Sequence, residues 1–238
     1  MTELKRESVS VVMPSYNERE NIAEAIRRII SALGSSLLEI IVVDDDSPDR
    51  TWEVVERLKE SRCRLIRRLN RRGLASALSE GTRLAQGEIV VWLDCDLGIS
   101  PEDMLRLVER LDEYDIAIGS RYVPGGEDRR SKFRAFLSRL FNDYARFILG
   151  NYFRDWTSGF AAARRQALVA LPLSDQGFGE YFIEWVYRAH QRDLKIIEVG
   201  YSYGYRKSGV SKTDGNWLRF FQLSLNYTGR VLWTRWKF

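Results

Sequence analysis

Acidic residues follow three short apolar segments of the sequence. Glu18 comes soon after the first segment, the triplet Asp44-Asp45-Asp46 ends the second, and Asp94 and Asp96 follow the third, residues 89–93. Carboxylates at the end of a buried strand are costly to desolvate unless a cation or hydroxyl groups pair with them. The pattern therefore indicates a divalent cation or the hydroxyls of a ribose. N-capping of the following helices is the alternative, and it explains one group more readily than three.

The elements that must position these residues alternate along the chain. Short β-branched segments predict strands at 8–13, 38–43, 63–66, 89–93, 116–119 and 194–203. Helix-period segments are predicted at 19–33, 48–60, 73–85, 101–111 and 180–191. Ser47 and Ser100, each before a proline, are predicted to cap two of these helices. The alternation predicts an α/β fold with a mostly parallel sheet, in which ligands bind beyond the carboxyl ends of the strands.

The composition limits the chemistry. His190 is the only histidine of the 238 residues, so a histidine pair is excluded and carboxylates must hold any divalent ion. Cys63 and Cys95 lack metal-ligand spacing, which predicts two small buried residues in a reducing compartment. The net charge is +4, and the 37 basic residues comprise 7 lysines and 30 arginines. An arginine-rich surface is compatible with phosphate-bearing substrates and with anionic membranes. The sequence contains no nucleic-acid recognition module, so we expect no nucleic-acid partner.

Two segments predict amphipathic helices with aromatic apolar faces and basic flanks. In 131–149 the apolar residues recur three or four positions apart, and the segment 216–238 mixes tryptophan and phenylalanine with arginine and lysine. Such helices lie in membrane interfaces, whereas packing on the domain is the alternative for 131–149. We therefore expect a domain at 1–215, which includes 131–149, and an interface helix at 216–238.

The expected location is the surface of a membrane. No uncharged apolar run reaches the roughly 18 residues of a spanning helix, and the first ten residues lack the apolar stretch of a signal peptide. These features predict a peripheral protein on the cytoplasmic face of a membrane.

Five motifs occur in a fixed order along the chain: VVMPSYNERENI, IIVVDDDSPDRTWE, DCDLGISPEDM, IGSRYVPGG and DWTSGFAAARR. The third contains the DXD motif, Asp94-Cys95-Asp96. The ordered set resembles family 2 glycosyltransferases of GT-A fold, and among them the dolichol-phosphate mannose synthases, over roughly residues 8–215. This resemblance implies a metal-dependent, inverting transfer of mannose from GDP-mannose to dolichyl or another polyprenyl phosphate.

The resemblance also implies roles for individual residues on the donor side. The residues expected to bind the donor are Pro14, Tyr16, Glu18, Asp44, Asp45, Asp94, Cys95, Asp96 and Lys212. Within this set, Asp94 and Asp96 would hold Mg²⁺ or Mn²⁺ against the diphosphate. Lys212 would close over the same diphosphate. Thr157, Ser158 and Gly159 would shape the sugar pocket, since a glycine lets the backbone approach a ligand closely.

On the acceptor side, the resemblance implies that Arg121, Arg134 and Arg206 face the lipid phosphate. Asp96, Arg121 and Arg206 form the expected catalytic set. The acceptor phosphate is already ionised near neutral pH, so no strong general base is needed. Fixed arginines offset the repulsion between two anions and orient the attacking oxygen.

The chain departs from this family at Gly98, where dolichol-phosphate mannose synthases usually carry a glutamine that binds the metal. Metal binding must then use Asp96, donor oxygens and water. Some members also continue into transmembrane helices, so peripheral docking or a small membrane partner subunit is expected here. Two alternatives stay open: the same reaction with UDP-glucose or another nucleotide sugar, and a catalytically silent subunit that binds lipid phosphate.

Overall fold

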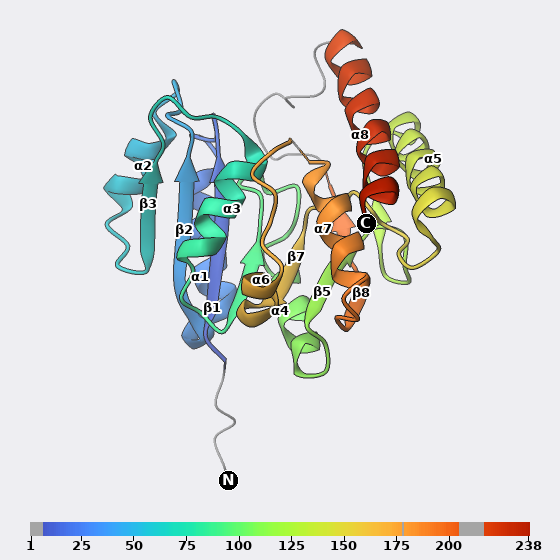
Figure 1. The fold of residues 1–238 in the computed structure, drawn as a ribbon. Coiled ribbons are helices and arrows are strands. Elements are labelled where there is room, and N and C mark those ends of the chain that lie inside the picture. The colour runs from blue at the N-terminus through green and yellow to red at the C-terminus, as the bar shows by residue number, and fades with distance from the viewer. Residues whose placement is uncertain (1–6, 178, 205–216) are drawn as a thin grey trace.

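A seven-stranded sheet forms the centre of the molecule. The computed structural model describes residues 7–177, 179–204 and 217–238, the last range with side chains from residue 225 on. The strands lie in the order β3 (Cys63–Arg67), β2 (Leu37–Asp44), β1 (Val9–Ser15), β4 (Ile89–Trp92), β7 (Ala161–Arg164), β5 (Ile116–Ser120) and β8 (Ile196–Gly200) (Figure 1). Strand β7 is antiparallel to both of its neighbours, and the other pairings in this sheet are parallel.

Helices cover both faces of the sheet because the central strands are apolar on both sides. In β1, Val9, Val11 and Met13 belong to one buried core, whereas Val12 belongs to the other. The first core is covered by α1 (Ile22–Leu33), α2 (Thr51–Leu58) and α4 (Asp103–Val108). The second is covered by α3 (Leu74–Leu84), α5 (Lys132–Leu149), α6 (Arg165–Ala170) and α7 (Tyr181–His190). This arrangement is the one expected of a parallel sheet.

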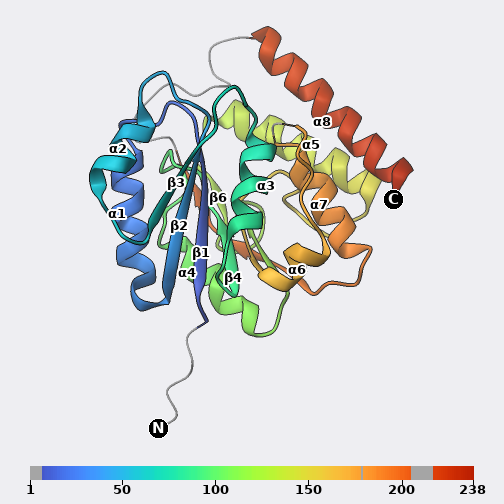
Figure 2. The ribbon, with the colours of Figure 1, turned by 60° about the vertical axis from the view of Figure 1, so that its left-hand side comes forward.

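The C-terminal helix α8 (Trp217–Lys237) packs against α5 and α7, and α5 and α8 lie side by side in both views (Figures 1 and 2). Val231 and Thr234 of α8 are fully buried in this contact. Among the described residues, no helix is both long enough and apolar enough to cross a membrane.

Short elements complete the described chain. Two 3-10 turns follow helices, at Gly34–Ser36 and Glu109–Asp112. The two-residue strands β6 (Glu127–Asp128) and β9 (Ser202–Tyr203) pair with each other outside the main sheet. This second pairing brings the loop after β5 next to the loop after β8.

The structure confirms the predicted alternation and the α/β fold, and it corrects two predicted helix caps. Helix α2 begins at Thr51 and α4 at Asp103, so neither proline stands at the first helical position. The Ser47 hydroxyl instead donates to Asp44, and the Ser100 hydroxyl accepts from Arg28 and donates to Glu102. Both serines serve nearby acidic side chains, which compete with a helix end for the hydroxyl group.

Candidate active site

Five neighbouring strands bring most of the predicted site residues to one edge of the sheet. Strands β2, β1, β4 and β5 point the same way, so their carboxyl ends share this edge. Strand β7 runs the opposite way, so its amino end, preceded by 157–159, lies there as well. The residues gathered in this way are Pro14, Tyr16, Glu18, Asp44, Asp45, Asp94, Cys95, Asp96, Arg121, Thr157, Ser158 and Gly159.

The loop after β2 is shaped by Asp44. This carboxylate is fully buried and accepts hydrogen bonds from the Ser47 backbone N–H at 2.8 Å and the Ser47 hydroxyl at 2.6 Å. The Ser47 hydroxyl in turn accepts the backbone N–H of Asn17, 3.0 Å away, from the loop after β1. Asp44 and Ser47 therefore join the loop after β2 to the loop after β1, the two loops predicted to bind the donor.

Asp45 pairs with Arg68, a buried arginine that the sequence analysis missed. Arg68 Nε donates to Asp45 Oδ1 at 2.7 Å, and the second oxygen accepts the Gly73 backbone N–H at 2.8 Å. The same guanidinium donates to the Ser76 hydroxyl and the Gly73 carbonyl, each at 3.0 Å. Its position directly after β3, at the ligand edge of the sheet, was the signal that could have identified it.

Tyr16 and Glu18 occupy the loop after β1. The guanidinium carbon of Arg72 lies 4.3 Å from the Tyr16 ring centre, which places a cation on one face of the ring. Glu18 is buried and accepts the Asn21 side-chain amide at 3.0 Å, while its own backbone N–H donates to the Thr51 hydroxyl. These contacts fix the loop between the first strand and α1.

The DXD motif forms a turn at the end of β4. Asp94 is exposed and Cys95 is buried. The Cys95 thiol donates to the Pro14 carbonyl at 3.4 Å, and this contact ties the turn to β1. Asp96 is buried, and its Oδ1 accepts the Gly98 backbone N–H at 2.9 Å. The motif thus presents one carboxylate to solvent and holds the other inside.

Tyr203 and Gly204 fill the space in front of Gly98. A Cβ at position 98 would lie 3.1 Å from Asp96 Oδ1, 3.3 Å from the Tyr203 ring and 3.5 Å from the Gly204 carbonyl. The Gly98 carbonyl also accepts the Gly204 backbone N–H at 2.9 Å. Burial raises the pKa of Tyr203 to about 12, and the charges of Asp96 and Asp94 add to this shift. A side chain at position 98 would therefore make close contacts with Asp96 and with the neighbouring loop.

The residues of the DXD motif fit a cation that a substrate helps to bind. Within the part of the chain that the structure describes, no group of three or more His, Cys, Asp or Glu residues could hold a metal ion by itself. Mg²⁺ commonly takes one or two carboxylates and completes its shell with substrate phosphates and water. An exposed Asp94 beside Asp96 supplies that number of oxygen donors of the right chemical kind.

Arg121, directly after β5, is held by a buried carboxylate. Its Nε and one terminal nitrogen donate to the two oxygens of Asp155, at 2.7 and 2.6 Å, and the same terminal nitrogen donates to the Thr157 hydroxyl at 2.8 Å. Burial disfavours the charged form, but the charge and hydrogen bonds of Asp155 outweigh it and raise the pKa of Arg121 well above its usual range. Arg121 is therefore a fixed, permanently charged group.

A second acidic residue extends this network. Asp128 Oδ2 lies 3.8 Å from Arg121, and both Asp128 oxygens accept from Arg130, at 2.8 and 2.6 Å. The guanidinium carbon of Arg130 lies 5.2 Å from the centre of the Tyr203 ring. The network thus connects the residues after β5 to those beside the DXD motif.

The predicted sugar-pocket residues lie between this network and α7. The Thr157 hydroxyl accepts from Asn142 of α5 at 3.2 Å, and the Ser158 hydroxyl accepts the Phe160 backbone N–H at 3.3 Å. Gly159 has φ +71°, a left-handed conformation that favours glycine, and a Cβ there would lie 3.9 Å from the Tyr181 hydroxyl. The preceding Trp156 is fully buried in the core.

The other three predicted residues are Arg134, Arg206 and Lys212. Arg134 is half-buried in the first turn of α5, whose N-cap Ser131 accepts the Arg134 backbone N–H at 3.4 Å. Arg206 and Lys212 lie outside the described residues.

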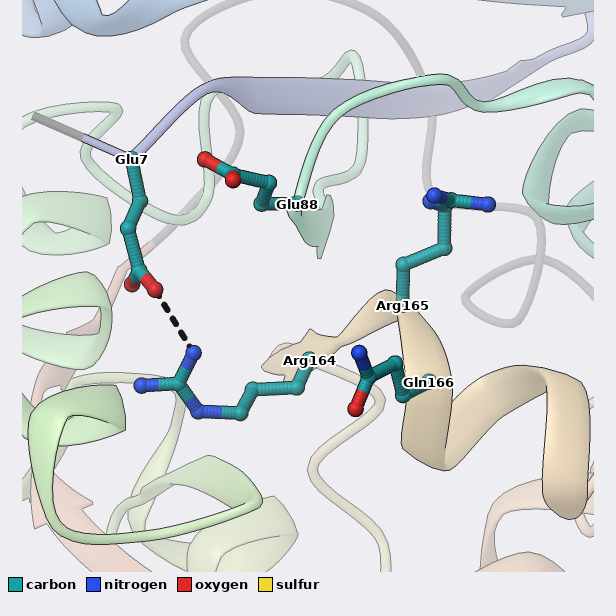
Figure 3. A pocket seen from close by; sticks show the side chains of 5 residues that line it. All are labelled: Glu7, Glu88, Arg164, Arg165 and Gln166. Carbon is teal, nitrogen blue, oxygen red and sulfur yellow. Dashed lines mark hydrogen bonds and ion pairs between the residues drawn. The ribbon is translucent and has the colours of Figure 1, made fainter.

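A pocket of about 160 Å³ lies at the opposite edge of the sheet, lined by Glu7, Glu88, Arg164, Arg165 and Gln166 (Figure 3). Glu7 pairs with Arg164 at 2.7 Å, and the two remaining charges of the lining are also of opposite sign. This pocket contains none of the predicted site residues.

Comparison with solved structures supports the class of fold. The chain superposes on glucosyl-3-phosphoglycerate synthase from Mycobacterium tuberculosis, solved in complex with Mn²⁺, uridine diphosphate and phosphoglyceric acid, with a TM-score of 0.72. The match covers 96% of this chain and 78% of the other at 23% identity, a likeness that concerns the fold alone. The predicted α/β GT-A fold is confirmed.

The chain belongs to glycosyltransferase family 2, because the family described as Glycosyl transferase family 2 matches residues 10–171. Dolichol-phosphate mannosyltransferase of Pyrococcus furiosus is 37% identical over 235 residues, which cover 94% of this chain and 65% of that relative's length. Polyprenol monophosphomannose synthase of Mycolicibacterium smegmatis is 36% identical, with 88% and 82% covered. Undecaprenyl-phosphate mannosyltransferase of Micrococcus luteus is 32% identical, with 87% and 88% covered.

Proposed function

We propose that this protein transfers mannose from GDP-mannose to dolichyl or another polyprenyl phosphate, with inversion at the sugar carbon. The observation that carries the proposal is the meeting of the DXD carboxylates and the fixed Arg121 at one sheet edge, beside helices with exposed aromatic faces. Relatives named as mannosyltransferases of polyprenyl phosphates support the choice of sugar and acceptor.

On the donor side, Asp94 and Asp96 would hold Mg²⁺ or Mn²⁺, which neutralises charge on the leaving nucleoside diphosphate. Tyr16, Glu18, Asp44 and Asp45, with the nearby Pro14, line the nucleoside end. Cys95 holds the turn against β1 through its contact with Pro14. Lys212 would close over the diphosphate.

On the acceptor side, the charge balance of the Arg121 network matters. Arg121 and Arg130 are matched by Asp128 and Asp155, so these four side chains carry no net charge. In this proposal the fixed guanidinium of Arg121 orients the attacking phosphate oxygen. Because the four side chains carry no net charge, Arg134 and Arg206 supply the additional positive charge that a lipid phosphate requires. Since that oxygen is already ionised, the chain needs no base to activate it.

We propose that α5 and α8 seat the protein on the cytoplasmic face of a membrane. Phe133, Phe136, Leu140 and Phe147 share one face of α5 and are exposed, Phe147 by 87%. On α8, Leu225, Leu232 and Trp236 also share one face and are exposed, and the exposed fraction of Trp236 is 86%. The flanking basic residues Lys132, Arg139, Arg235 and Lys237 match an anionic lipid surface. In this assignment 216–238 is the interface helix and 1–215 the catalytic domain.

An organic-extraction assay tests the reaction. Purified protein, Mn²⁺ or Mg²⁺ and dolichyl phosphate in detergent are incubated with labelled GDP-mannose or labelled UDP-glucose. Label that enters the lipid phase from GDP-mannose alone is the expected result. Transfer from UDP-glucose alone would overturn the choice of donor. Label that stays in water with both donors, together with binding to anionic liposomes, would instead favour a silent lipid-phosphate-binding subunit or a requirement for a small membrane partner.

A further inference from the structure

Tyr227 of α8 fills the junction between α5 and the start of α7. Its ring meets Phe141 of α5 edge-on, with centroids 5.6 Å apart and planes at 87°. Its hydroxyl lies directly against Gly179, because a Cβ at that position would overlap the tyrosine oxygen. A residue with a side chain at 179 would therefore displace Tyr227 or the start of α7.

One turn further along, an ion pair ties α8 to α7. Arg230 lies 2.8 Å from Glu184 Oε2, and both side chains are largely buried. Glu184 Oε1 also accepts from Arg188 at 3.4 Å, and Arg235 donates to the Tyr187 hydroxyl at 3.2 Å. A buried ion pair holds one geometry, since any other arrangement leaves a charge without a partner. Helix α8 is thus fixed on α7.

The first turn of α7 reaches the candidate site. The Tyr181 hydroxyl faces Gly159, in the predicted sugar pocket. Burial raises the pKa of Tyr181, and the charge of Asp94 adds to this shift. Burial likewise raises the pKa of Tyr227, to which Glu180 and Asp94 contribute. Both tyrosines therefore lie within electrostatic reach of the exposed DXD carboxylate.

We propose that Tyr227 is a positioning residue for the transfer reaction, which holds Gly179 and Tyr181 at the start of α7 in place beside Gly159. The inference rests on the proposed function. Helix α8 would then have two roles. Its outer face is assigned to the membrane, and its inner face supports the sugar pocket. Loss of the ring would let the start of α7 move, so the sugar would be held less well for transfer. The nucleoside end, at β1 and β2, would not change.

The test compares full-length wild type with Tyr227→Ala, Tyr227→Phe and Val231→Ala. The readouts are kcat and KM for GDP-mannose, binding of GDP with Mn²⁺, and cosedimentation with anionic liposomes. For Tyr227→Ala we expect kcat to fall about tenfold or more while GDP and liposome binding change by less than about twofold. Tyr227→Phe should retain at least about half of kcat, because its ring keeps the contact with Phe141 and its Cζ still reaches Gly179.

Val231→Ala is the matched control, because Val231 is fully buried one turn along the same face of α8. It should lower stability without lowering kcat. If Tyr227→Ala does not fold, Tyr227→Leu replaces it, because leucine fills the Phe141 contact but does not reach Gly179, and the same loss of kcat is expected. The proposal would be overturned by a wild-type kcat in Tyr227→Ala or its replacement Tyr227→Leu, or by an equal loss of kcat in Val231→Ala. A loss of GDP binding parallel to the loss of kcat in the same Tyr227 variant would also overturn it. Absence of mannose transfer by the wild type would instead remove the proposed function itself.

Discussion

At the scale of single residues, the candidate site consists of charges whose partners are largely within the protein. Asp44 is satisfied by Ser47, Asp45 by Arg68 and Gly73, and Arg121 by Asp155. Such pairing fixes side chains before a ligand arrives, which lowers the cost of ordering them during the reaction. Asp94 is exposed on the solvent side of the DXD turn.

Asp96→Asn tests the metal role of the DXD motif. Asparagine keeps an oxygen that can accept the Gly98 N–H, so the turn should persist. Removing the negative charge weakens cation binding, so we expect mannose transfer to fall by about 100-fold or more. Circular dichroism should show an unchanged fold, and calorimetry should show weaker binding of GDP with Mn²⁺. Near-normal turnover would contradict the metal role.

Gly98→Gln tests the departure at position 98, where the resemblance implies a glutamine that binds the metal. A Cβ at 98 would lie 3.1 Å from Asp96 and 3.3 Å from the Tyr203 ring, tighter than ordinary contacts, so the neighbouring loop must move. We expect a lower melting temperature and slower transfer in this variant. Gly98→Gln with Tyr203→Ala should recover part of the stability. Tighter metal binding in the single variant without loss of stability would refute this explanation.

Arg68→Met tests whether the ion pair between Arg68 and Asp45 stabilises the loop after β2. The side chain is 2% exposed, and its removal leaves the buried Asp45 carboxylate without its ion pair. The expected loss is about 3–5 kcal/mol in the free energy of unfolding by urea. Arg67→Met is the matched control, because Arg67 is 39% exposed and pairs with Asp46, so it should cost about 1 kcal/mol or less. Equal losses in the two variants would contradict the assigned difference.

At the scale of elements, α5 has two distinct sides. Its inner side reaches the site, since Asn142 Oδ1 accepts the Trp156 backbone N–H at 2.6 Å and the Ser138 hydroxyl accepts from Tyr122 at 2.8 Å. Its outer side exposes the aromatic residues assigned to the membrane. One helix therefore connects the proposed lipid surface to the acceptor side of the site.

Phe147→Glu and Trp236→Glu test this membrane face. Each replaces an exposed aromatic side chain whose burial in lipid would contribute about 1.5–3 kcal/mol. We therefore expect the affinity for anionic liposomes to fall about tenfold or more in cosedimentation. Val169→Glu is the control, because Val169 is 73% exposed on α6, away from α5 and α8, and should not change binding. Binding losses of the same size in all three variants would contradict the assignment.

The elements were predictable from sequence wherever apolar periodicity sets them. The strands from β1 to β5 and the helices α1, α3 and α5 begin within a few residues of their predicted positions. Strand β7 was not predicted, because its run of alanines carries no strand preference and only pairing between β4 and β5 makes it a strand. The caps at Ser47 and Ser100 failed because local acidic side chains use both hydroxyls.

At the scale of the whole molecule, strand order explains which of the predicted site residues the structure brings together. The acidic groups were predictable because each follows its own strand, and the strands β2, β1 and β4 are neighbours. The positions of Tyr203 and Tyr227 were not predictable, because only the folded chain brings Tyr203 of β9 beside Gly98 and Tyr227 of α8 against Gly179. Sequence motifs therefore predicted that these carboxylates share one edge of the sheet, but not which aromatic side chains lie around them.

The most direct test of the central claim is the structure of the reaction product. Wild-type protein is incubated with GDP-mannose, Mg²⁺ and dolichyl phosphate, and the lipid product is analysed by NMR at the sugar carbon. Attack by the phosphate oxygen on the α-linked donor in one displacement predicts mannosyl phosphate of β configuration in the lipid. An α-linked product would contradict inversion, and a lipid phase without mannose would contradict the proposed transfer.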